Sequence, residues 1–69
     1  MSHLFDIVQW AKENGDERVL ARMRVFSLPV LMKEKIHLES IESGRTCSQE
    51  TLDKIREAAE KVTKKKCPY

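Results

Sequence analysis

The chain has 69 residues, of which 41% are hydrophobic and 35% are charged, and its net charge at pH 7 is +2. This length allows one domain, and the composition excludes a disordered chain. The small net charge does not by itself require a polyanionic partner. Basic residues exceed acidic ones mainly near the end of the chain, at Lys61, Lys64, Lys65 and Lys66.

Several classes of protein are disfavoured by what the sequence lacks. No uninterrupted apolar run approaches the ~18 residues of a membrane helix, and no basic segment followed by an apolar one opens the chain. We therefore expect a cytoplasmic protein that contacts no membrane and keeps Cys47 and Cys67 reduced. The cysteines and histidines lack the spacing of zinc ligands, and there is no glycine-rich phosphate loop. We expect no metal, no cofactor and no catalytic residues, and thus not an enzyme.

Apolar residues recur at helical spacing along most of the chain. This pattern predicts an all-α fold in which residues 1–69 form a single small bundle of about four helices. The first helix is expected over residues 2–13, and Asn14 and Gly15 end it. Asp16 can cap the second helix, whose apolar residues are Val19, Leu20, Met23 and Phe26.

The segment Ser27–Pro29 interrupts the pattern, because proline donates no backbone hydrogen bond and disfavours helical geometry at the residue before it. In one arrangement Ser27 caps a third helix that has Pro29 in its first turn and runs to about Ser43. In the other, the second and third helices are one long helix kinked at Pro29. The sequence leaves both arrangements open.

The fourth helix is expected over residues 48–65. Gly44 supplies a positive φ before it, and Thr46 or Ser48 can cap it. Its apolar residues form one stripe: Leu52, Ile55, Ala59 and Val62. Residues 66–69 are expected to be a frayed end.

Residues 25–32 are apolar on every side except at Ser27, and a small bundle cannot bury every side of a helix. This segment therefore belongs in part to the core and in part to an interface, and the sequence gives the two equal weight. Because a core this small supplies only ~3–5 kcal/mol of stability, we expect a homodimer. The candidate dimer or partner contacts are Leu28, Val30, Leu31 and Met32.

Residues 41–55 contain the pattern I-E-x-G followed by S-x-E-T-L-x-K-I, carried by Ile41, Glu42, Gly44, Ser48, Glu50, Thr51, Leu52, Lys54 and Ile55. This segment resembles the part of Cro/C1-type helix-turn-helix repressors that closes the DNA-reading helix and opens the next one. The resemblance implies a compact helical bundle that binds DNA and regulates transcription. It places Leu20 and Ala21 on the first helix of the bihelical unit, Phe26 in its turn and Leu31 on the second helix.

Two functional hypotheses follow. The first is a small DNA-binding transcriptional regulator, for which the candidate contacts are Lys33, Lys35, His37 and Arg45. The second is an all-helical protein-protein interaction module, such as an adaptor, inhibitor or antitoxin-like partner. The resemblance favours the first, which is our prediction, and the second is the alternative. The second is favoured by the apolar stretch and by the acidic residues Glu34, Glu39 and Glu42, which suit a phosphate-lined groove poorly.

Overall fold

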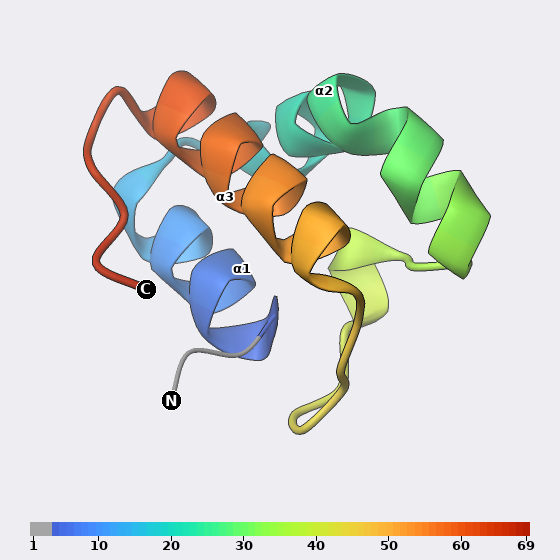
Figure 1. The fold of residues 1–69 in the computed structure, drawn as a ribbon. Coiled ribbons are helices and arrows are strands. Elements are labelled where there is room, and N and C mark those ends of the chain that lie inside the picture. Colours follow the sequence, from blue (N-terminus) through green and yellow to red (C-terminus); the bar gives the residue numbers. More distant parts are fainter. Residues whose placement is uncertain (1–3) are drawn as a thin grey trace.

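The structure, a computed structural model, describes residues 4–69 and consists of helices joined by short connections (Figure 1). The elements are α1 (Leu4–Asn14), α2 (Val19–Glu34), the short 3-10 helix η1 (Leu38–Ser40) and α3 (Gln49–Thr63). Among the described residues there is no strand, so the all-α prediction is confirmed. Within residues 4–69 the bundle has three α-helices rather than the expected four. Residues 2 and 3 of the expected first helix lie outside the described range.

The first connection is tight because it contains a glycine. The N–H of Gly15 donates to the carbonyl of Ala11 at 2.8 Å and ends α1. A Cβ atom at position 15 would lie only 2.5 Å from Cγ2 of Val19. The first residue of α2 can therefore pack closely against this turn only if position 15 is glycine.

Asp16 acts in this turn rather than as the residue directly before α2. Its carboxylate accepts a hydrogen bond from the N–H of Arg18 at 2.9 Å, and its carbonyl accepts one from the N–H of Val19 at 3.1 Å. The carboxylate thus satisfies a backbone donor near the helix start, which otherwise has no partner within the helix.

The expected break at Ser27–Pro29 does not form, because α2 continues through Pro29 to Glu34. Of the two arrangements that the sequence left open, the structure has the single helix, which bends along its length (Figure 1). Pro29 cannot donate to the carbonyl of Val25, four residues earlier. Both residues lie on the exposed side of α2, where water can bind that carbonyl, so the helix continues at reduced cost.

The predicted continuation of a helix to Ser43 is wrong. α2 ends where Lys35 adopts a left-handed conformation, with φ 54°, and the N–H of Ile36 donates to the carbonyl of Leu31 at 2.9 Å. This is the usual geometry of a helix C-terminus. Ile36 and Leu38 are then buried while His37 is exposed, an alternation that requires extended backbone rather than helix.

α3 begins as expected, with Ser48 as its N-cap: the Ser48 hydroxyl accepts a hydrogen bond from the N–H of Thr51 at 3.2 Å. Residues 66–69, expected to be frayed, instead fold back toward α1 (Figure 1). Cys67 is only 7% exposed and belongs to the core, and its N–H donates to Oε2 of Glu60 at 2.8 Å. A small apolar side chain and one backbone hydrogen bond thus anchor the end of the chain.

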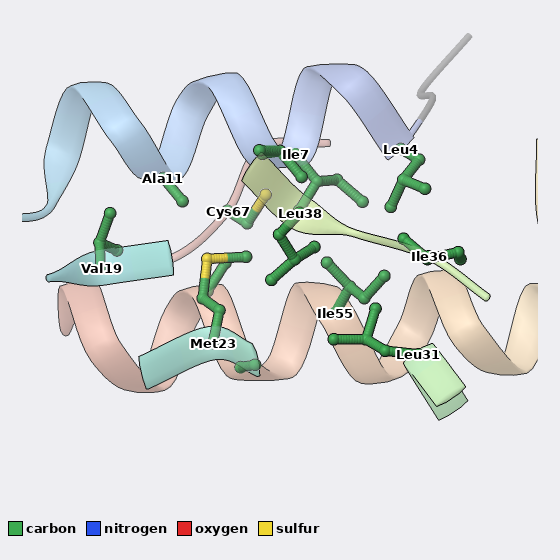
Figure 2. Close-up of a cluster of buried hydrophobic side chains, with 13 residues drawn as sticks. Leu4, Ile7, Ala11, Val19, Met23, Leu31, Ile36, Leu38, Ile55 and Cys67 are labelled. Atoms are coloured by element: carbon green, nitrogen blue, oxygen red, sulfur yellow. The ribbon is translucent and has the colours of Figure 1, made fainter. Parts of the chain in front are cut away.

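The core lies between α1 and α3, and α2 and η1 close it (Figure 2). Met23 and Ile55 are fully buried at its centre, on α2 and α3 respectively. The other large buried side chains are Leu4, Ile7, Leu31 and Leu38. α3 packs against both α1 and α2. α1 and α2 therefore each turn one side toward the core and the opposite side toward solvent.

Replacing Pro29 with alanine tests whether α2 is continuous. In a continuous helix the change removes an unfavourable interior residue, so the free energy of unfolding should rise by ~1–3 kcal/mol. Chemical denaturation followed by circular dichroism measures this change. Leu28→Ala, at an exposed neighbouring position, controls for general effects of surface substitution. If Pro29 instead began a separate helix, the alanine variant would be no more stable than the unmodified protein.

Candidate functional site

The most distinctive surface of the molecule is a row of apolar side chains on the outer side of α2. We call Ala21, Val25, Leu28 and Met32 the outer stripe. Their spacing of four, three and four residues places them on one side of an α-helix. Val25 is 70% exposed, Met32 69% and Leu28 42%, whereas a typical soluble domain exposes such side chains singly.

The outer stripe lies opposite the side of α2 that faces the core, which contains Val19, Met23, Ser27, Val30 and Leu31. At 100° per residue, the stripe spans roughly 60° of the helix circumference. A stripe this narrow, at this spacing, is the pattern of a seam between two helices.

Basic residues flank the outer stripe. From residue 18 to residue 33 the chain contains four basic residues and no acidic one, and the basic residues are Arg18, Arg22, Arg24 and Lys33. All four are exposed. Arg22 has an acidic partner within the chain, Asp16, at 3.4 Å, and both side chains of this pair are about half exposed. The surface around the stripe is therefore cationic.

An open groove runs beside the C-terminal half of the outer stripe. Its volume is about 360 Å³, and it is lined by Arg24, Leu28, Leu31, Met32, Lys35, Ile36 and His37. Its floor is apolar and its rim carries the cations. The groove therefore extends the stripe toward the end of α2.

Phe26 is half exposed but does not belong to the outer stripe. The ammonium group of Lys61 lies 4.7 Å from the centre of its ring, which is the geometry of a cation-π contact. Since Lys61 is on α3, this contact fixes the Phe26 ring over the junction of α2 and α3. Phe26 thus contributes to the packing of the two helices.

The structure separates the four residues expected at a dimer or partner interface. Leu28 and Met32 are exposed and belong to the outer stripe. Val30 and Leu31, which are 8% and 2% exposed, lie on the core side of α2. Val25 and Ala21 also belong to the stripe and were not among the predicted contacts, although their spacing from Leu28 could have identified them.

The four candidate DNA contacts lie around the C-terminal end of α2. Lys33 is in its last turn, Lys35 follows it, and His37 lies in the extended segment; all are exposed. Arg45 comes from the connection before α3 and donates from Nη2 to the carbonyl of Glu34 at 3.1 Å. Cations near a helix C-terminus interact favourably with its dipole. The turn that the resemblance places at Phe26 lies inside α2, so residues 19–34 form one helix and not two.

Glu34 connects the end of α2 to the start of α3. The N–H of Ser48 donates to Oε1 of Glu34 at 3.0 Å and to Oε2 at 3.3 Å. This backbone hydrogen bond, with a smaller contribution from the side chain of Thr51, lowers the pKa of the Glu34 carboxyl below its ordinary value. Burial, and then the nearby Glu34 charge, raise the pKa of the Cys47 thiol. A raised pKa leaves less reactive thiolate.

Among residues 4–69, no group of three or more histidine, cysteine, aspartate or glutamate side chains is placed to hold a metal ion. None of the helices in that range has the length and hydropathy needed to cross a membrane. Cys47 and Cys67 are both free thiols.

The chain matches no protein family, no curated protein and no solved structure in comparisons with each of these. Functional conclusions therefore depend on the surface that the fold itself presents.

Replacing Glu34 with glutamine tests the connection between α2 and α3. The pKa of Glu34 is lower in the folded state, so its charge stabilises the fold above the ordinary carboxyl pKa, and this contribution is lost as the pH falls through the folded value. Glu34→Gln should thus lower the melting temperature at pH 7, and the difference from the unmodified protein should shrink toward acid pH. Glu42→Gln serves as the control, and equal behaviour of the two variants at every pH would contradict the assignment.

Proposed function

We propose that this protein is an all-helical protein-protein interaction module that binds its partner through the outer side of α2. The observation that carries the proposal is the outer stripe: Val25, Leu28 and Met32 are large, apolar and exposed on one side of a single continuous helix. Exposed apolar rows of this kind, bordered by polar residues, mark interaction sites. Methionine suits such a surface because its flexible side chain adapts to the contact.

The chemistry of the surface supports binding rather than catalysis. A catalytic site needs a nucleophile or base held beside polar groups in a concave pocket, and the outer stripe is a row of hydrocarbon side chains with arginines at its edges. Methionine and arginine are enriched at protein interfaces, and arginine is among the residue types that carry most of the binding energy there. The homodimer expected from the sequence would use the same stripe, and a second copy of the chain is one candidate occupant.

Site-specific photo-crosslinking tests the proposal directly. A photoreactive amino acid in place of Leu28 should give a covalent adduct with a protein in the organism that encodes the chain. The same amino acid in place of Lys12, an exposed residue of α1, should give none. Leu28→Glu, combined with the photoreactive amino acid in place of Met32, should remove the adduct because a carboxylate would be buried against the partner. Adducts formed equally from positions 28 and 12, or from neither, would refute the proposal.

The second candidate function is duplex DNA binding. It is supported by the exposed cations Lys33 and Lys35 at the end of α2 and by the lack of acidic residues between positions 18 and 33. Contacts of this kind would be made with phosphates, which give affinity without sequence preference.

A mobility shift on random-sequence duplex DNA at low salt tests this second function. A DNA-binding protein should lose affinity steeply as salt is added, and Lys33→Ala and Lys35→Ala should each reduce the salt slope by ~1. Lys12→Ala on α1 is the control and should change neither quantity. Absence of a shift at low salt would end the DNA hypothesis and leave the interaction module unaffected.

A further inference from the structure

We propose that the partner of the outer stripe is an acidic amphipathic helix belonging to another protein. This inference rests on the proposed function of α2 as an interaction surface and specifies the chemistry of the occupant. It depends on two separate features of α2: the width of the apolar stripe and the sign of the charges beside it.

The geometry of the stripe favours a helix as the occupant. Ala21, Val25, Leu28 and Met32 follow the alternation of four and three residues that brings two helices into register along a seam. The small side chain of Ala21 allows a close approach at one end, and the long side chain of Met32 fills space beside the groove at the other. An extended peptide would instead need an open strand edge or a groove with backbone partners.

The charges select an acidic helix. In a two-helix seam, the residues directly beside the apolar positions face the edges of the partner helix and determine which partner is accepted. On α2 these places hold Arg24, next to Val25, and Arg22, next to Ala21, while Lys33 follows Met32. Arg22 already contacts Asp16 within the chain, so Arg24 and Lys33 are the cations left for a partner. Glutamate or aspartate at the edges of the partner would pair with these cations, and apolar residues at its centre would bury the stripe.

A second copy of the chain fits the stripe but not its charges. Two α2 helices packed against each other would bring arginines and lysines together, because residues 18–33 contain no acidic residue to receive them. The nearest acidic residues, Asp16 and Glu17, precede the helix, and Asp16 already contacts Arg22 within the chain. Glu34, at the C-terminal end of α2, already accepts a hydrogen bond from the N–H of Ser48. Like charges across an interface suppress a partner. The basic residues of α2 therefore disfavour pairing with the α2 helix of a second copy.

Two other negatively charged partners, duplex DNA and an anionic membrane, fit the stripe less well. Duplex DNA offers phosphates to the cations but leaves Val25, Leu28 and Met32 exposed to water. An anionic membrane would accept apolar side chains, but helices that lie in a membrane surface present a broad apolar side, and the outer stripe spans roughly 60°. Only an acidic amphipathic helix satisfies both the seam and its edges.

Two synthetic peptides provide the probe. Each has about three heptads with leucine at the two seam positions, and the other five positions of each heptad carry glutamate in the acidic peptide and lysine in the basic peptide. Like charges keep either peptide from pairing with itself. Fluorescence anisotropy of the labelled peptides, titrated with the full-length protein, measures affinity. The acidic peptide should bind at least about tenfold more tightly than the basic one, since several ion pairs of modest strength add up.

Variants connect this preference to α2. Arg24→Glu should weaken binding of the acidic peptide about tenfold and strengthen binding of the basic peptide. Lys12→Glu on α1 makes the same change in net charge and should alter neither affinity. Leu28→Glu should abolish binding of both peptides, and its circular dichroism spectrum should match that of the unmodified protein because position 28 faces solvent.

The outcomes separate this inference from the function on which it rests. Equal binding of the two peptides, or binding of neither, would overturn the acidic-helix assignment. If sedimentation shows self-association that Leu28→Glu removes, the stripe is an interface but its occupant is a second copy. If random duplex DNA or vesicles of anionic lipid bind and Leu28→Glu removes that binding, the occupant is a polyanion. Self-association of this kind, or binding of DNA or lipid of this kind, would refute the acidic helix as the occupant. A negative crosslinking result at position 28 would refute the interaction module itself.

Discussion

The packing of α2 against α3 determines how the remainder of the chain is arranged. Met23 of α2 and Ile55 of α3 are fully buried in the core, which residues of α1, η1 and the C-terminal segment complete (Figure 2). A helix offers only one side to such a contact, and no other α-helix of the described residues packs on the outer stripe of α2. Pro29 lies on that free side, where its missing hydrogen bond is least costly. The uncovered surface and the tolerated proline thus have the same origin.

Much of the fold follows from local signals in the sequence. Gly15 ends the first helix because a side chain there would collide with Val19, and Ser48 caps α3 as its hydroxyl predicts. The backbone path of residues 26–43 was harder to predict. The tendency of proline to break a helix depends on which side of the helix faces water, and the sequence alone does not show that side. A signal for the extended segment was present: apolar Ile36 and Leu38 alternate with polar neighbours, a period of two and not of 3.6. Nothing in the sequence of the last residues indicated that Cys67 would enter the core.

Only two of the four predicted interface residues lie on the surface, because the sequence does not show which side of the helix faces the core. A segment that is apolar on every side cannot be divided into core and surface until the direction of its neighbour is known. Once α3 fixes that direction, Leu28 and Met32 become surface, whereas Val30 and Leu31 become core. The cations beside the stripe were visible in the sequence. Their significance depends on the helix being continuous from residue 19 to residue 34, since only then do they border a single apolar row.

The hydrogen bond between the N–H of Ser48 and the carboxylate of Glu34 also has a practical consequence for engineering the protein. It closes the connection between α2 and α3 at its base, and the yellow loop between η1 and α3 projects away from the helices (Figure 1). Gly44 has φ +86°, and a side chain there would meet no atom within 4 Å. Lengthening a closed loop costs only about 0.6 kcal/mol for each doubling of its length. This turn is therefore suited to accept an inserted epitope or reporter that leaves both termini and the whole of α2 untouched.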